Sequence, residues 1–280
     1  MQAVRPTVID KSAHAEFIDK VVAANLDPAD PWVRDYVSMS WERARPFFLT
    51  KGLPVPGSKV LEFGCNIGAS SIMLASMGAE VTAIDINPDY VNIARANAKA
   101  HGVSEHVEFL HVTDTRKLPF ADNAFDLVVC NSVLEYVQDD HLDRVLGEID
   151  RVLKAGGILF VLGTSSGLWP REVHSRAWLV NYLPRTLDSL IRKMSPDFMR
   201  GLSPWRLLRR MERYENLDRS DNDNSLLAAK RQITPLWKYT LLRLFRVASL
   251  LSGASLGLML PSITVALKKP QAADVARQPP

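Results

Sequence analysis

A short segment with two glycines, residues 62–68, holds the types of residue that bind a charged small molecule. Gly64 and Gly68 have no side chain, so the backbone can turn sharply there and pass close to a ligand. A helix is expected to begin at Gly68, where free backbone N–H groups would point toward a polar or anionic group. Glu62 would repel a phosphate and attract an amino group. The segment favours a zwitterionic ligand; an ordinary tight turn is the simpler alternative.

Three further polar residues, Asp85, Asp114 and Asn131, each lie at or just past the end of an expected strand. Asp85 lies about 20 residues after the glycine segment, where an acid can accept hydrogen bonds from both ribose hydroxyls. Asp114 can accept from an adenine amino group, and Asn131 can face the reacting end of the ligand. Taken singly, each also fits a capping or turn role. Their order and shared placement favour a nucleoside-binding site.

The elements that must position these residues alternate along the chain. Val/Ile/Leu-rich strands are expected at 59–63, 81–86, 107–112, 125–130 and 158–162. Helices are expected at 69–77, 88–101 and 142–153, the last closed by Gly156 and Gly157. This alternation predicts an α/β fold with a doubly wound, mostly parallel sheet. In such a sheet the ligand lies beyond the carboxyl ends of the strands, where the polar residues fall.

Residues 59–163 resemble class I S-adenosylmethionine-dependent methyltransferases. The resemblance lies in VLEFGCNIG (60–68), VTAIDI (81–86), Asp114-Thr115 before LPF (118–120), FDLVVCN (125–131), VLEYV (133–137) and RVLKAGG (151–157). It covers over a third of the chain. It implies a Rossmann-like fold and S-adenosyl-L-methionine as the cofactor.

The resemblance also implies a role for each matching residue. Glu62 and the glycines would surround the methionine part of the cofactor, Asp85 would hold the ribose, and Asp114 the adenine amino group. Asn66 stands where a glycine is common, but Asn tolerates left-handed backbone angles. The cofactor-binding residues expected on this basis are Glu62, Gly64, Cys65, Asn66, Gly68, Asp85, Ile86, Asp114, Thr115 and Asn131.

A nicotinamide-dependent oxidoreductase is the main alternative for this fold, because Asp85 would serve there equally. The G-x-G-x-x-G pattern is missing, since Asn66 stands at its second glycine position after Gly64. Glu62 would also face a pyrophosphate unfavourably. The cofactor of a methyltransferase is therefore the favoured ligand.

The catalytic residues are not identified by the sequence. Glu135 and Tyr136 follow the fourth strand, and His174 follows the fifth, so each can act as a base or orient the acceptor. Tyr136 also fits the role of a residue at the start of a helix, packed on the core. At this position many relatives with small-molecule substrates have His. His174 fits a solvated loop residue equally well. The scattered His and Cys residues predict no metal site.

The chain beyond the fifth strand predicts further units. About 100 residues precede the last expected strand, 262–267, and they include expected helices at 187–194, 204–214 and 235–251. A helix is also expected at 31–49, before the first strand. We expect an N-terminal helical lid (1–58), a cofactor-binding core (59–169), a basic helical cap (170–252), a final strand region (253–269) and a disordered tail (270–280).

Composition narrows the class of protein. The 280 residues are 47% hydrophobic and 23% charged, with a net charge of +3, which is ordinary for a globular protein. Two cysteines exclude a disulfide scaffold and indicate a reducing compartment. The charge is divided, with −7 over residues 1–170 and +8 over 171–246. Four arginines share one face of the expected helix: Arg206, Arg209, Arg210 and Arg213. This face is either simply exposed to solvent or attracts an anionic substrate or a membrane.

The ends of the chain and its uncharged stretch bear on location. Residues 1–30 lack the apolar region of a signal peptide. Residues 247–267 carry no charge, but Gly253 and Pro261 interrupt them, which favours a helix, a loop and a strand over a membrane span. We therefore expect a cytoplasmic protein, with peripheral membrane contact through the basic cap left open.

Together these features predict an enzyme that methylates oxygen or carbon of a small, apolar or anionic acceptor. The text after the fourth strand, Asn131-Ser132-Val133-Leu134, lacks the Asn-Pro-Pro-Tyr-like element of enzymes that methylate amino groups of bases or glutamine. An RNA methyltransferase is the enzymatic alternative, suggested by the basic second part, although nucleic acid is not the favoured partner. A methyltransferase-like binding protein without activity is the other alternative.

Overall fold

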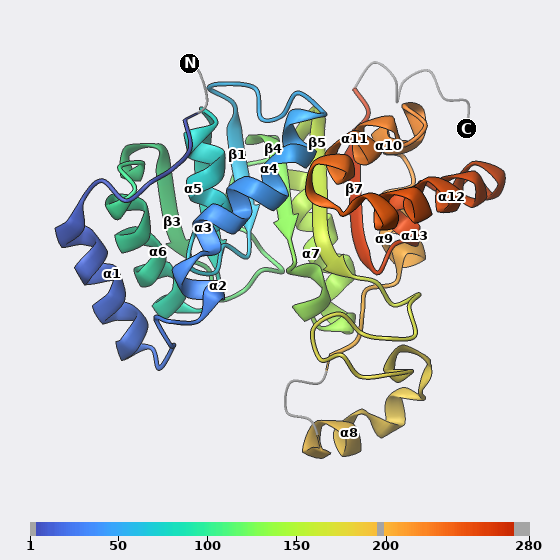
Figure 1. Cartoon of the computed structure of the whole chain (residues 1–280), viewed down its shortest axis with the longest axis horizontal. Coiled ribbons are helices and arrows are strands. Elements are labelled where there is room, and N and C mark those ends of the chain that lie inside the picture. The colour runs from blue at the N-terminus through green and yellow to red at the C-terminus, as the bar shows by residue number, and fades with distance from the viewer. Residues whose placement is uncertain (1–3, 195–198, 272–280) are drawn as a thin grey trace.

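The computed structural model describes residues 4–194 and 199–271, in which a seven-stranded sheet lies between two layers of helices (Figure 1). The strand order is β3-β2-β1-β4-β5-β7-β6. Strands β1 to β5 are parallel, and β7 is antiparallel to β5. The strands are β1 (Lys59–Phe63), β2 (Glu80–Asp85), β3 (Val107–His111), β4 (Phe125–Asn131), β5 (Leu153–Ser165), β6 (Glu215–Asn216) and β7 (Ser262–Lys268). The predicted doubly wound α/β fold is confirmed.

The strand order changes direction at β1, which pairs with β2 on one side and β4 on the other. Val60 is opposite Val81 in β2 and Leu127 in β4, so the three strands end at one edge of the sheet. A crevice opens at such a switch point, because the loops after β1 and β4 leave toward opposite faces. The segment after β1 and the residues after β2 and β4 therefore meet there.

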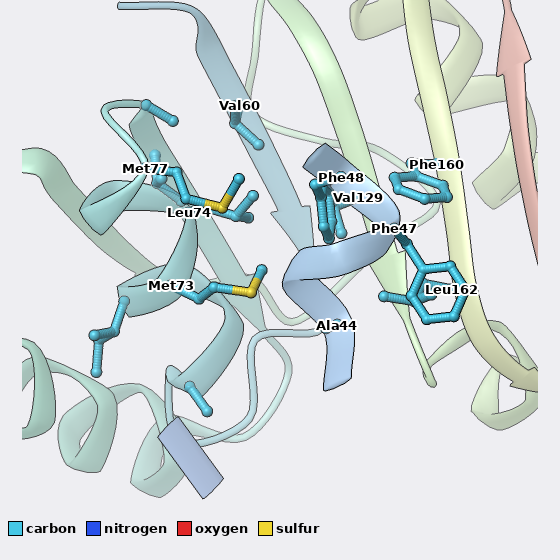
Figure 2. Close-up of a cluster of buried hydrophobic side chains, with 14 of the residues drawn as sticks. Ala44, Phe47, Phe48, Val60, Met73, Leu74, Met77, Val129, Phe160 and Leu162 are labelled. Atoms are coloured by element: carbon cyan, nitrogen blue, oxygen red, sulfur yellow. The ribbon is translucent and has the colours of Figure 1, made fainter. Parts of the chain in front are cut away.

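Alternating side chains of the strands bury two separate cores. Val60 faces one core, formed with α4 (Arg45–Leu49), α5 (Ala69–Ser76), α6 (Pro88–Ala100) and α11 (Asn224–Ile233). In that core Phe48 meets Phe160 edge to face, with ring centroids 4.7 Å apart (Figure 2). Leu61 faces the other core, formed with α7 (Asp139–Val152) and α9 (Pro204–Arg210). Truncating such a buried phenylalanine to alanine typically costs about 3–5 kcal/mol.

The N-terminal residues form several short helices that pack on this body. α1 (Lys11–Ala23) lies against α6, where Phe17 and Val21 join a third apolar cluster with Ile93. The predicted continuous helix at 31–49 was wrong. The structure has α2 (Pro31–Arg34), α3 (Tyr36–Met39), a π-helical turn (Ser40–Ala44) and α4. Asp35, with φ of −107°, separates α2 from α3.

The remaining helices follow β5 or join the strands. After α8 (Asp188–Met194) and α9 come α10 (Leu217–Ser220), α11, α12 (Leu236–Ser252) and α13 (Leu256–Met259). Single 3₁₀ turns occur at Ser104–His106, Leu134–Tyr136, Val180–Tyr182 and Arg185–Leu187. Within residues 170–252, α9 and α11 lie on opposite faces of the sheet and so belong to its two helical layers.

Several boundaries of helices and strands differ from the prediction. α7 begins at Asp139 and ends at Val152, and Gly156 and Gly157 lie inside β5. β5 starts earlier than predicted because Leu153 already pairs with Phe125. The register between β4 and β5 then shifts, so that Leu127 pairs with Ile158 and the two glycines lie in the irregular stretch. α9 ends at Arg210, short of the predicted 214. The predicted end of a helix at Gly253 and the predicted last strand are confirmed. Most of the predicted disordered tail lies outside the described residues.

Buried and half-buried ion pairs connect distant parts of the chain. Lys51 Nζ donates to Asp218 Oδ1 at 2.6 Å, and both side chains are almost fully buried. Asp218 Oδ2 also accepts from the backbone N–H of Ala266 in β7. Arg206 pairs with Asp139 and Asp143 at the start of α7. The arginine face of α9 thus serves, in part, to hold α9 on α7.

Candidate cofactor and acceptor site

The loop after β1 requires the backbone angles that its residues adopt. Gly64 and Gly68 have φ of +79° and +83°, and Asn66 has φ of +48°. A Cβ at Gly64 would lie 2.2 Å from Cγ2 of Val133, so no side chain fits there. Asn66 occupies the left-handed region, as expected of a residue standing in place of glycine. The loop can therefore pass close to a ligand.

Asp85 joins the loop after β1 to the loop after β2. Its Oδ2 accepts from the backbone N–H of Asn66 at 2.8 Å, and its Oδ1 accepts from that of Asn87 at 2.9 Å. Each carboxylate oxygen keeps a further lone pair, which suits a pair of ribose hydroxyls. Ile86 follows with 63% of its surface exposed, and it offers an apolar surface beside the carboxylate.

Glu62 is buried behind the same loop and accepts a hydrogen bond from the hydroxyl of Ser71. Burial raises the pKa of Glu62 to about 8, and the nearby charge of Asp85 adds to the effect. The carboxyl is therefore mostly protonated at neutral pH until a cation arrives. Cys65 is buried alongside, and burial raises the pKa of its thiol.

Asn131 closes the site at the end of β4. Its Nδ2 donates to Oγ of Ser70 at 2.8 Å, so the ends of β4 and α5 are joined. Ser70 and Ser71 begin the helix whose N-terminal residue is Gly68. The structure thus brings Glu62, Asp85 and Asn131 around one glycine loop.

Asp114 and Thr115 form a separate turn after β3. The carboxylate of Asp114 accepts from the guanidinium of Arg116 at 2.8 Å and from its backbone N–H, and these bonds lower the pKa of Asp114 to about 2. Thr115 is half-buried. The turn follows Val112, whose N–H donates to the carbonyl oxygen of Asp85. An adenine amino group would have to share Asp114 with Arg116.

Tyr36 reaches the site from α3, although the sequence did not mark it as a site residue. Burial raises the pKa of its phenol, and the nearby Glu62, Tyr136 and Cys65 raise it further. Tyr36 therefore lies near both Cys65 in the loop after β1 and Tyr136 after β4. Its place in the predicted N-terminal lid (1–58) was the only sequence signal for it.

The segment after β4 carries a buried carboxylate paired with a histidine. Glu135 Oε1 accepts from Nε2 of His174 at 2.9 Å and from the backbone N–H of Ser165 at 3.0 Å. The Glu135 side chain is buried, while that of His174 is 31% exposed. Glu135 Oε2 is buried without a hydrogen-bond partner among the described residues. The Tyr136 ring lies 5.8 Å from the imidazole.

Glu172 fixes the loop that carries this histidine. It is fully buried and accepts from Oγ of Ser165 at 2.7 Å and from the backbone N–H groups of His174 and Ser175. Burial opposes its ionisation, but these hydrogen bonds hold its pKa below the usual value. Hydrogen bonding to Glu135 raises the pKa of His174, against the effect of burial. Glu172 was not a predicted site residue, and no motif marked it.

A match to a known protein family covers the residues at this edge of the sheet. Residues 61–161 match a family model described as a methyltransferase domain, and they hold the loop after β1 together with Asp85, Asp114 and Asn131. The chain carries a class I S-adenosylmethionine-dependent methyltransferase domain. The predicted cofactor, S-adenosyl-L-methionine, follows from that membership.

Named relatives of the methyltransferase domain act on different kinds of acceptor. The chain is 29% identical over 179 residues to a ubiquinone biosynthesis O-methyltransferase of Xylella fastidiosa, over 63% of this chain and 71% of that one. It is 39% identical over 107 residues to a sterol 24-C-methyltransferase of Gibberella zeae, over 38% of this chain and 27% of that one. For most of the curated relatives, the match spans less than two thirds of their length.

A solved structure supports the fold. The structure of a geranyl diphosphate methyltransferase with S-adenosylmethionine aligns with a TM-score of 0.51 and 19% identity, over 89% of this chain and 94% of that one. At this identity the likeness shows the shared fold.

The residues at this edge fit the cofactor. The carboxyl of Glu62 suits the amino group, and Asp85 suits the ribose hydroxyls. The bound cofactor supplies a methyl group that is already activated on a sulfonium. Over the described ranges, no three His, Cys, Asp or Glu side chains gather as a metal site would require.

Proposed function

We propose that this methyltransferase domain transfers the methyl group to oxygen or carbon of a small, apolar acceptor, with His174 as the general base. The observation that carries the proposal is the Glu135–His174 pair between the ends of β4 and β5. The names of the relatives, a ubiquinone O-methyltransferase and sterol C-methyltransferases, support an apolar acceptor that loses a proton from oxygen or carbon.

In this mechanism, the carboxylate of Glu135 accepts the Nε2–H of His174, which leaves the lone pair of Nδ1 free to take a proton from the acceptor. When the imidazole becomes charged, Glu135 and the nearby Glu172 stabilise it. Glu172 keeps the loop in place, and Tyr36 and Tyr136 lie where they would exclude water and orient the acceptor.

The predicted roles of the cofactor residues belong to this proposal. We infer that Glu62 holds the amino group of the cofactor, Asp85 the ribose, Ile86 the adenine face, and Asn131 the methionine end. We also infer that the N-terminal residues 1–58 act as a lid, because Tyr36 lies near Cys65 in the loop after β1. The segment 170–252 contributes His174 and Glu172 to the acceptor side.

RNA is the less favoured acceptor. Several cations of the basic segment are already paired within the chain, so fewer are free for phosphates. Arg206 pairs with Asp139 and Asp143, and Arg185 also pairs with Asp139. A binding protein without activity is less favoured, because it would have no use for the carboxylate of Glu135, whose burial beside His174 costs stability.

The test uses S-adenosylmethionine carrying a labelled methyl group and a panel of acceptors: prenylated phenols, isoprenoid alkenes and RNA. We expect label in the heptane-extractable product of a phenol or an alkene, and about 10²- to 10⁴-fold less with His174→Gln. Label in RNA alone would contradict the proposed acceptor class. Cofactor binding without transfer to any of the three would favour a binding protein.

A further inference from the structure

Helix α12 packs on the body of the molecule through a narrow stripe. Tyr239 and Leu242 pack against the first core, Arg246 donates to Oδ1 of Asn224 at 2.9 Å, and Ser249 Oγ donates to Asp223 at 2.8 Å. The spacing of these residues places them on one face of the helix. Figure 1 shows α12 extending outward from the sheet.

The opposite face of α12 is apolar and exposed to solvent. At 3.6 residues per turn, the residues opposite the packed stripe span about 140° of the helix surface and include no charged side chain. Their large side chains are between 47% and 86% exposed: Leu236, Trp237, Leu241, Leu244, Val247 and Leu251. A contiguous apolar surface of this kind indicates a binding surface. We call these six residues the outer face of α12.

The charges around the outer face are all positive. Lys238 lies at one edge of the apolar arc and Arg243 at the other, both exposed. No Asp or Glu occurs from residue 224 to residue 273. Lysine and arginine at the edges of an apolar face can extend toward phosphates while the face itself is buried.

We propose that α12 lies in the plane of a lipid bilayer that contains anionic lipids, with its outer face among the acyl chains. Lys238 and Arg243 contact the headgroups, and Trp237 enters the bilayer with the rest of the outer face. The cationic border disfavours a second copy of the same face, because like charges would meet. Among the helices that the structure describes, none has the length and apolarity to cross a bilayer. The proposal concerns docking, and it does not depend on which acceptor is methylated.

The test is flotation of the full chain with phosphatidylcholine vesicles that contain, or lack, phosphatidylglycerol. We expect the protein to float with the anionic vesicles and at least tenfold less with neutral ones. The fraction of the double variant Leu244→Glu/Leu251→Glu that floats with anionic vesicles should be at least tenfold lower than that of the parent protein. The matched control is Val22→Glu/Val55→Glu, because these valines are 57% and 60% exposed outside α12 and the charge change is the same. We expect the control to bind vesicles like the parent.

The proposal would be overturned if the protein did not bind anionic vesicles. It would also be overturned if the two double variants weakened binding equally. A stable dimer in light scattering that dissociates only in Leu244→Glu/Leu251→Glu would assign the outer face to a second copy instead. Calorimetric binding of S-adenosylmethionine by each variant shows that it is folded. Flotation without methyl transfer would leave the docking proposal standing and contradict only the proposed function.

Discussion

Nε2 of His174 lies 2.9 Å from Oε1 of Glu135, and this contact leaves Nδ1 as the nitrogen that can take a proton in the proposed reaction. The hydrogen bond raises the pKa of His174 above its ordinary value. A general base must be neutral, so kcat/KM should fall as the pH drops through that raised pKa.

Replacing Glu135 with Gln removes the charge that raises the pKa of His174. The acidic limb of the pH profile of kcat/KM should therefore move to lower pH, while kcat also falls. His174→Gln should abolish the limb and lower kcat by about 10²- to 10⁴-fold. Both are measured by initial rates against pH with the labelled cofactor. An unchanged acidic limb in His174→Gln would show that another group is the base.

Cofactor binding should release a proton from Glu62. Burial raises the pKa of the free carboxyl to about 8, so at pH 7 it is mostly neutral, and an ammonium group beside it stabilises the charged form. Titration calorimetry in buffers of different ionisation enthalpy should show release of close to one proton at pH 7 and little at pH 9. Glu62→Gln should release none. Equal proton release in both proteins would remove Glu62 from the amino-group site.

Gly64→Ala should lower cofactor affinity at least tenfold. The new methyl group would overlap Val133, and a φ of +79° costs a non-glycine residue about 1–2 kcal/mol. Gly57→Ala is the matched control, because Gly57 has φ of +76° with open space around it. The double variant Gly64→Ala/Val133→Ala should recover the part of the affinity that is lost through overlap with Val133. The part lost through the unfavourable backbone angle at position 64 should remain. Wild-type affinity in Gly64→Ala would contradict the requirement for glycine.

Asp85→Asn should weaken cofactor binding by about 10- to 100-fold, since one hydrogen bond to a charged group is worth about 1.5–3 kcal/mol. Asp114→Asn should have a smaller effect, because Arg116 already shares that carboxylate. The dissociation constants are compared by calorimetry. A larger loss in Asp114→Asn would reverse the assigned importance of the two acids.

The buried pair of Lys51 and Asp218 should matter for stability. Lys51→Met leaves the carboxylate of Asp218 buried without its cation, which typically costs about 3–5 kcal/mol. Denaturant unfolding measures the change, and Lys51→Met/Asp218→Asn should lose less than Lys51→Met alone. Additive losses in the double variant would mean that the two side chains do not interact.

The sequence predicted the parts of the site that depend on local order. The glycine loop follows β1 directly, and Asp85 and Asn131 are the last residues of β2 and β4. Recognising the strands was therefore enough to bring these residues together. Asn66 was also predicted correctly to tolerate a left-handed conformation, because that property belongs to the residue itself.

The parts built by distant contacts could not be predicted. Glu172 and Tyr36 come from segments without regular periodicity, and their contacts with Ser165 and with the loop after β1 depend on how those segments fold back. The arginines of α9 illustrate the same limit. Their helical spacing was visible, but only the packing on α7 shows that Arg206 pairs with Asp139.

Strand β7 lies between β5 and β6, although about 100 residues separate Ser165 from Ser262, which face each other in the sheet. The chain must lose the entropy of closing a loop of that length before the hydrogen bonds between β5 and β7 can form, and this slows folding. During synthesis, β5 would emerge from the ribosome well before its partner and present an open apolar edge to the cell. The slowest and most aggregation-prone stage of folding should therefore be the insertion of β7, long after the cofactor half has taken shape.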